Sequence, residues 1–197
     1  MQTSSKSVMA ALAASLIATA APLKDVERQR LVAHIELTRA WLLDEVSGLS
    51  TEQLQFHSRE GAWSVAEVVE HLRIAEPIYW QQLKDAVKAP ASEEKPAATD
   101  ADVLWYGIDR TQRQKTEARK TPGDAPRHTT EGLDAFRKLH AEILDYARNT
   151  QADLRSHLVP KEGVDAYQWI LGISTHTMRH ILQIREVKAD PNFPRKQ

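Results

Sequence analysis

The stretch that most constrains the fold is residues 165–188, whose side chains repeat with the period of an α-helix. Isoleucine and valine recur along it every three or four residues, which places them on one helix face. Asp165, with Gln168 three residues later, predicts a capping box at the start, and Asp190-Pro191 supplies a stop. The sequence therefore predicts one long amphipathic helix near the C-terminal end of the chain.

Two histidines, His176 and His180, lie four residues apart within this stretch. On a helix, side chains four apart project from the same face, so the two rings lie close together, as in a metal clamp. Both are at the edge of the apolar stripe and need partners, because burying an unpaired polar group costs about 1–3 kcal/mol. The pair alone leaves two readings open, which are metal ligands or core histidines hydrogen-bonded to backbone or carboxylates.

Three further long helices are predicted upstream. Each has an apolar face at helical spacing, strand-like alternation is not found, and glycine is scarce at 7 of 197 residues, which together predict an all-α protein. A short extra helix is expected between the second and third core helices, and Pro77 should bend the second or divide it after Glu76. The expected ranges are 23–46, 64–88 and 130–158 for the core helices, with 153–158 possible as a separate turn, and 102–120 for the extra helix.

A third histidine, His71, is on the core-facing side of the predicted second helix. It shares that face with Val68, Ala75 and Tyr79. In a bundle it could meet the histidine pair of the last helix. Taken alone, His71 also fits a core histidine with ordinary hydrogen-bond partners, but taken with the pair we favour three metal ligands.

Composition excludes several classes of protein. The formal net charge is −1 and basic residues form no stripe, so no nucleic-acid partner is expected. Cysteine is absent, which excludes disulfides and thiolate ligands. With 42% hydrophobic residues, the chain can bury a core as one domain.

The N-terminus predicts export. Residues 8–18 are apolar, and Ala18-Thr19-Ala20 fits a cleavage site with small residues. We therefore expect residues 1–21 to be a signal peptide and residues 22–197 to be a periplasmic or secreted domain. The alternative is that the alanine-rich segment begins an amphipathic helix of a cytoplasmic protein. The apolar run is too short to span a bilayer, so no membrane is expected for the mature form.

Four segments of the chain occur in a recognisable order and spacing. They are Gly48 to Ser50, the run from Trp63 to His71, the run from Asp165 to His180, and the tail from Gln183 to Pro194. In this order they resemble the DinB superfamily of DinB-like four-helix-bundle proteins, over about residues 25–195.

This resemblance implies an up-and-down-type four-helix bundle with one divalent metal ion held by three histidines. The family positions fall on His71, His176 and His180, so all three are filled. The departures from the family pattern are at Phe56-His57 and at residues 159–162, and neither involves a ligand. A homodimer is also possible by the same resemblance.

The ligand set suggests the chemistry. Three neutral imidazoles on zinc, nickel or iron leave at least one position open, which marks a catalytic rather than a structural site. The leading hypothesis is a metal-dependent hydrolase acting on a small molecule. The alternatives are a thiol-dependent S-transferase, which export would disfavour, and a non-catalytic metal-binding stress or interaction protein.

No catalytic residue is assigned from the sequence. Gln183 could orient water or substrate, Glu76 and Tyr79 are possible acids or bases, and Glu67 is already explained as a helix cap. Arg179 could neutralise an anionic substrate, but it is expected to face solvent. No role is given to the remaining histidines, His34, His57, His128, His140 and His157.

Overall fold

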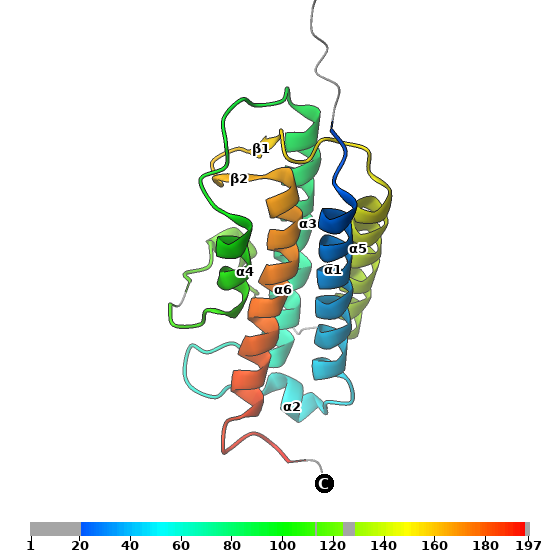
Figure 1. Ribbon diagram of the computed structural model, residues 1–197. Coiled ribbons are helices and arrows are strands. Elements are labelled where there is room, and N and C mark those ends of the chain that lie inside the picture. The colour runs from blue at the N-terminus through cyan, green and yellow to red at the C-terminus, as the bar shows by residue number, and fades with distance from the viewer. Residues whose placement is uncertain (1–20, 113, 124–128, 196–197) are drawn as a thin grey trace, which may run out of the picture.

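The computed structural model describes residues 21–112, 114–123 and 129–195, and it shows four long helices packed as a bundle (Figure 1). The predicted all-α four-helix bundle is confirmed. The signal peptide predicted at residues 1–21 lies, apart from Ala21, outside the described residues. The four core helices are α1 (Asp25–Val46), α3 (Val65–Lys88), α5 (Thr129–Asn149) and α6 (Ala166–Lys188).

Short elements fill the connections between the core helices. The capping boxes expected at Ser50, Ser64 and Asp165 are all formed, each with a side chain three residues later. The two strands, which were not predicted, form one antiparallel pair next to the start of α6. The short elements are α2 (Thr51–Gln55), α4 (Asp100–Ile108), the 3₁₀ helix η1 (Ala118–Lys120), β1 (Leu158–Val159) and β2 (Val164–Asp165).

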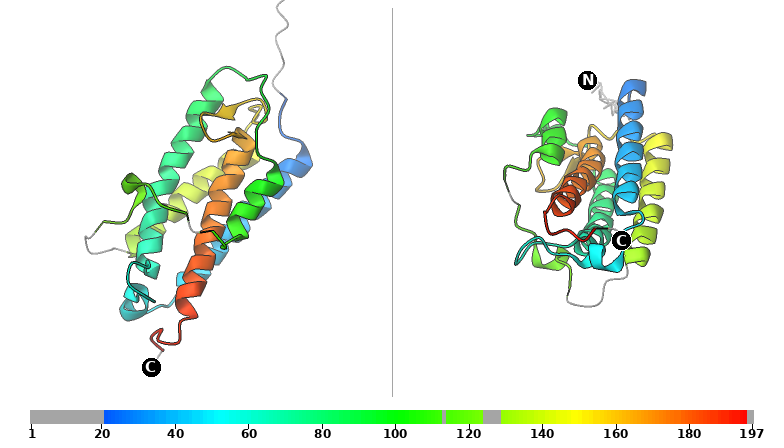
Figure 2. Two further views of the ribbon diagram at one scale, coloured as in Figure 1. Left: turned by 90° about the vertical axis from the view of Figure 1, so that its left-hand side faces the viewer. Right: turned by 90° about the horizontal axis from the view of Figure 1, so that it is seen from below.

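The four core helices pack in an order different from their order along the chain. Both α5 and α6 pack against α1 and α3, which lie at opposite corners of the bundle (Figure 2). α1 and α6 run in the same direction, since His34 contacts Ser174 and, further along both helices, Glu45 contacts Lys188.

α3 and α5 also run parallel, since Glu76 contacts His140 and, further along both helices, Trp80 contacts Glu142 (Figure 1). Consecutive core helices therefore do not all alternate in direction as in the up-and-down order that the resemblance implied, and the chain between α3 and α5 returns along the bundle through α4 and η1.

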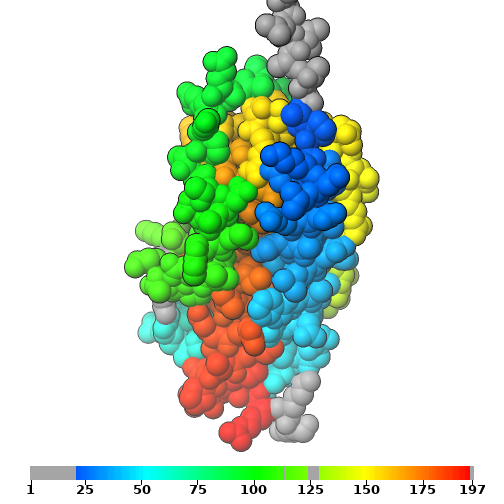
Figure 3. Space-filling model, in the orientation of Figure 1, coloured from blue at the N-terminus to red at the C-terminus, as the bar shows by residue number. Residues whose placement is uncertain are grey.

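α4 covers the outer side of α6. It packs against this helix, and the space-filling view shows α6 exposed between α4 and α1 (Figure 3). The contact is close because Gly107 has no side chain: a Cβ there would lie 2.9 Å from the Cβ of Thr175. α4 and the chain after it are thereby held beside the half of α6 that carries the histidine pair.

A polar layer crosses the middle of the bundle between two apolar clusters. One apolar cluster includes Ile35, Trp80 and Ile143, and the other includes Leu42 and Leu72. On each core helix, a polar side chain lies between members of the two clusters, so the layer has contributions from all four helices. Its buried members are Thr38, Glu76, His140, Ser174 and Thr177.

The extra helix is shorter than the sequence predicted. α4 ends at Ile108 instead of extending to residue 120, and the chain continues irregularly to η1. Two interactions replace helical bonds there. The Asp109 carboxylate accepts hydrogen bonds from the backbone N–H and hydroxyl of Thr111, and the Arg179 guanidinium donates to the carbonyls of Tyr106, Asp109 and Gln112.

The other helix boundaries are close to the expected ones. α5 ends at Asn149, where the Arg28 side chain donates to the carbonyls of Ala147, Arg148 and Thr150 and so satisfies the helix end. Residues 150–157 therefore form a separate turn. α3 is continuous through Pro77, so of the two expected effects of this proline, a bend or a division after Glu76, the division does not occur.

Candidate metal centre

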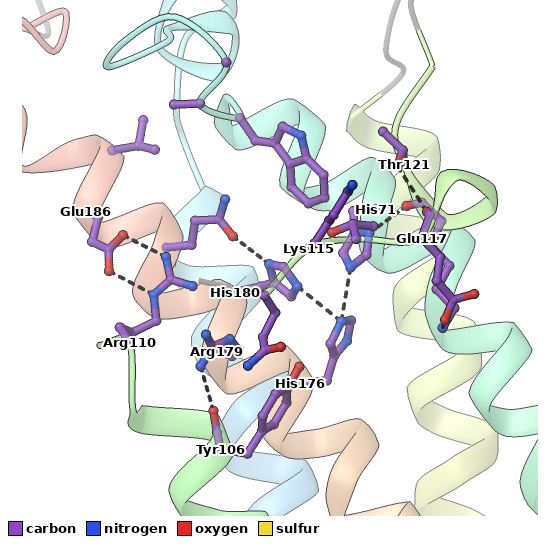
Figure 4. Close-up of a pocket in the computed structure, with 18 of the residues that line it drawn as sticks. His71, Tyr106, Arg110, Lys115, Glu117, Thr121, His176, Arg179, His180 and Glu186 are labelled. Carbon is purple, nitrogen blue, oxygen red and sulfur yellow. Dashed lines mark hydrogen bonds and ion pairs between the residues drawn. The ribbon is translucent and has the colours of Figure 1, made fainter. Parts of the chain in front are cut away.

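The three predicted histidines meet at one point in the bundle. His71 comes from α3, and His176 and His180 come from successive turns of α6 (Figure 4). The Nε2 atom of His176 lies 3.1 Å from Nε2 of His71 and 3.2 Å from Nε2 of His180. Two nitrogens bound to tetrahedral zinc at about 2.0–2.1 Å lie about 3.3–3.4 Å apart, so the spacing is that of ligands around one ion.

The opposite nitrogen of each ring is held by an oxygen atom. Nδ1 of His71 lies 2.7 Å from the Lys120 carbonyl, and Nδ1 of His180 lies 2.9 Å from Oε1 of Gln183. Nδ1 of His176 lies 3.3 Å from the Glu76 carboxylate. Carbonyl and carboxylate oxygens only accept, so each Nδ1 carries the proton, and all three Nε2 atoms present lone pairs to one another.

This arrangement fits a divalent metal ion. Three lone pairs converge without a proton donor between them, which is unfavourable unless a cation is bound there or one ring takes up a second proton. Among the residues that the structure describes, these three are also the one group of histidines and carboxylates with the convergence of a metal site. The fixed Nδ1–H tautomers match those that metal-bound histidines require.

Burial favours the neutral form of two of the three rings, those of His71 and His180. Burial of His71, and then the nearby charge of His176, lower the pKa of His71 from 6.5 to about 4. The same two causes, burial first and then His176 and His71, hold the pKa of His180 well below 6.5. A metal ligand must be unprotonated, so these two rings are ready to bind at neutral pH.

Glu76 connects the histidine cluster to the polar layer. Its fully buried carboxylate accepts from Nε2 of His140 at 2.7 Å and from the Thr177 hydroxyl at 2.7 Å, in addition to His176. Burial by itself raises the pKa of Glu76, but the charges and hydrogen bonds of His140 and His176 outweigh it and bring the pKa to about 2. The group is therefore a carboxylate that orients His176, as in carboxylate–histidine–metal arrangements.

Aromatic rings enclose the cluster. The Trp63 ring lies 4.9 Å from the His71 ring and stacks on His180, with centroids 6.3 Å apart. The Tyr79 ring meets His176 edge-on at 5.2 Å. These rings restrict the rotation of the imidazoles and exclude water from their sides.

The histidines open into a cleft of about 880 Å³. Its walls come from the loop before α3, from α3 and α6, from the end of α4 and the residue pair after it (106–110), and from residues 114–121. Of the residues that the structure describes, five basic and four acidic side chains line it, so these walls carry a small positive excess before any metal ion is counted. They are Arg59, Arg110, Lys115, Lys120 and Arg179, with Glu117, Glu162, Glu186 and Asp190.

The structure separates the other residues considered from the sequence. Gln183 and Tyr79 line the cleft, whereas Glu67 caps α3 and accepts from His57. Glu76 lies behind His176 and accepts its Nδ1–H, so it orients a candidate metal ligand. It does not face the cleft, where a catalytic acid or base would have to lie. Arg179 is only 4% exposed and binds backbone carbonyls, so the expectation that it faces solvent is wrong.

Three contributors were missed in the sequence. His140 was given no role from the sequence, although a histidine and a glutamate on core-facing positions of two helices are a signal for a buried pair. Trp63 was noted only beside the helix start. The Lys120 carbonyl had no sequence signal, because it comes from irregular chain that was predicted to be helix.

Together, the fold and the site define a helical bundle with a candidate three-histidine metal centre at the base of a cleft. The chain belongs to the DinB superfamily, whose family model matches residues 34–184. It is 30% identical over 152 residues to the uncharacterised protein YuaE of Bacillus subtilis (strain 168). The matched region covers 74% of this chain and 89% of YuaE.

A solved structure has the same fold. It is YfiT from Bacillus subtilis, described as a probable metal-dependent hydrolase with an unusual four-helix bundle topology. The superposition gives a TM-score of 0.57 with 19% identity, and it covers 84% of this chain and 88% of YfiT. At this identity the likeness establishes the fold. None of the helices in the described ranges is long and apolar enough to cross a membrane.

Proposed function

We propose that this protein is a divalent-metal-dependent hydrolase that acts on a small molecule, with His71, His176 and His180 as the metal ligands. One observation carries the proposal: three Nε2 lone pairs converge at the base of a cleft while each Nδ1 is held by an oxygen acceptor. The description of YfiT as a probable metal-dependent hydrolase supports the reaction class. Zinc, nickel and iron all suit three imidazoles.

The residues of the chain prepare this site in distinct ways. A divalent ion held there supplies Lewis-acid activation of water or of a substrate carbonyl at neutral pH. Glu76 and Gln183 fix the rings of His176 and His180, and the Lys120 carbonyl fixes His71. Trp63 packs against two of the rings and shields them from solvent.

The cleft favours an enzyme over a protein that uses the ion only for stability. All three histidines contribute to the lining of the cleft. Among the described residues no fourth protein ligand closes the cluster on that side, so a substrate can reach it there. A closed site would leave no such access. The small-molecule substrate follows from the cleft volume of about 880 Å³, which is in the range of ligand pockets.

We further propose that residues 1–21 direct export, that the mature domain begins at about residue 22, and that it acts in the periplasm or outside the cell. Intact Met1 on protein purified from the producing cell would contradict export. Association into a homodimer is a separate proposal, and light scattering of the purified domain tests it.

Metal analysis tests the proposed function directly. The untagged protein should contain about one divalent ion per chain, and His71→Ala should contain much less while its helical circular dichroism stays close to wild type. The loaded wild type is then assayed with ester, amide and thiol-conjugate substrates. Turnover of esters or amides that His71→Ala lacks is the expected result, and turnover only in the presence of a thiol would indicate an S-transferase. Failure of the wild type to take up zinc, nickel or iron would overturn the metal site.

A further inference from the structure

Lys120 occupies an unusual position in the wall of the cleft. Its carbonyl holds His71, while its side chain, only 10% exposed, points along the same wall. The ammonium lies over the Tyr79 ring, 4.6 Å from the centroid, and that ring in turn contacts His176 edge-on. A lysine charge is thus placed beside the histidine cluster and on an aromatic face.

The ion pair of Lys120 leaves its charge available to a ligand. The partner is Glu117, whose carboxylate lies 2.8 Å from the ammonium but whose side chain is 56% exposed. An ion pair with a solvent-exposed carboxylate is weak, because water competes for the carboxylate. Glu117 is also shared with Arg119, so it can leave Lys120 and keep a partner.

The charges around the histidines favour an anion. Among the described residues, the lining of the cleft has one more basic than acidic side chain, and an ion held by three neutral imidazoles would add two positive charges. Glu186 is paired through both oxygens with Arg110, so it does not offset the charge of Lys120. The carboxylate nearest the cluster, Glu76, is fully buried behind His176 and is used by three donors.

We propose that Lys120, held over Tyr79, is the anion-binding residue of the cleft and that the ligand carries a carboxylate. This inference rests on the proposed metal site and specifies the substrate class for it. When the ligand binds, its carboxylate takes the place of Glu117 as the partner of the Lys120 ammonium. The ammonium and the Tyr79 ring then position the rest of the ligand next to the three histidines.

The side chain of Lys120 can be removed without removing its carbonyl. Lys120→Met therefore keeps the backbone oxygen that holds His71, and metal uptake is expected to stay at wild-type level. Arg119→Met is the matched control, because Arg119 belongs to η1, pairs with the same Glu117 and has the same charge, yet it is 61% exposed and does not line the cleft.

The experiment uses full-length protein loaded with Co²⁺, whose visible absorption reports ligands that bind beside the histidines. Acetate is the anionic probe and imidazole is the neutral probe. Lys120→Met should weaken acetate about tenfold, as the loss of a charge-assisted hydrogen bond does, and change imidazole binding less than twofold. Arg119→Met should leave both affinities within twofold of wild type.

A second variant tests whether Glu117 competes with the ligand for Lys120. Glu117→Gln removes the competing carboxylate, so acetate should bind about threefold more tightly. Wild-type acetate affinity in Lys120→Met, or an equal loss in Arg119→Met, would overturn the anion site while leaving the metal site intact. A wild-type chain that takes up no Co²⁺ would overturn both, whereas a loaded protein without hydrolase activity would contradict the reaction alone.

Discussion

The polar layer and the two apolar clusters belong to the same four helices, yet they are held together in different ways. In the clusters, side chains such as Ile35, Leu72 and Ile143 are fully buried and need only complementary volume. In the polar layer, Glu76 requires three donors from two other helices, and each donor must be in place. Apolar packing tolerates changes of shape, whereas a buried carboxylate tolerates no missing partner.

The difference teaches where precision in this bundle comes from. The apolar clusters bring the helices together, but they do not fix the rotation of a ring. The layer does so, because Glu76 is bonded at once to His140 on α5 and to His176 and Thr177 on α6. His176, the proposed metal ligand, is therefore positioned by three helices, which explains why the candidate site lies directly next to the layer.

The largest effect is expected from Glu76→Ala. Removing the carboxylate leaves His140 and His176 without this acceptor and leaves the Thr177 hydroxyl with only the Ile173 carbonyl, 3.3 Å away. Breaking such a buried pair costs about 3–5 kcal/mol of unfolding free energy. The loss of the His176 partner should also lower metal affinity about 10–100-fold. Urea denaturation and competitive metal titration measure the two effects.

Ile143→Ala is the matched control from the apolar cluster, one turn from His140. It should lose a comparable free energy, about 2–5 kcal/mol, because it leaves a cavity. Its metal affinity should stay within about threefold of wild type. Equal loss of metal affinity in both variants would mean that stability alone, and not the carboxylate, governs the site.

A smaller effect is expected from pH on the metal-free protein. His71 has a pKa of 6.5 when unfolded and about 4 when folded, and the pKa of His180 is also lowered. The unfolded state therefore binds more protons between these values, so the stability that is fully present above pH 6.5 is lost as pH falls toward 4. The expected loss is about 2–3 kcal/mol for His71.

Urea midpoints of metal-free wild type and His71→Gln at pH 7 and pH 4.5 measure this loss. The variant lacks one of the titrating rings, so its midpoint should move less than that of wild type. Glu76, with a pKa of about 2, destabilises the fold only below its unfolded value of 4.5, which places its contribution in a lower window. Equal shifts in the two proteins would show that His71 does not remain neutral in the fold.

The sequence was sufficient for the four core helices and for placing the three histidines on two of them. The capping boxes and the periodic apolar faces are local, so they can be seen without knowing which helices touch. The predicted ligands also required only that α3 and α6 be neighbours, which the family resemblance supplied.

The remaining parts of the site depend on contacts between distant residues. The Lys120 carbonyl reaches His71 only because the chain stops being helical at Ile108, and that stop depends on Arg179 of α6. A buried arginine that binds carbonyls cannot be told from an exposed one by helical spacing. The parallel course of α1 and α6 likewise depends on how the long connections between helices pack. Local sequence patterns carry no information about that packing.

The smallest effect is expected from Thr38→Val, at the far side of the polar layer. The Thr38 hydroxyl bonds Ser174 at 2.8 Å and the carbonyl of His34 at 3.0 Å, and Nδ1 of His34 bonds Ser174 at 2.7 Å. Valine removes the hydroxyl, but Ser174 keeps His34, so the expected loss is about 1 kcal/mol.

Metal titration of Thr38→Val decides whether the polar layer is one unit or two. No hydrogen bond joins Thr38, Ser174 and His34 to Glu76 among those the structure describes, and the two groups meet only through the backbone of α6. Metal affinity should therefore be unchanged, and the losses of unfolding free energy in Thr38→Val and Glu76→Ala should add in the double variant. Non-additive losses, or weaker metal binding in Thr38→Val, would show that α1 also positions His176, and the division between the two halves of the layer would then be wrong.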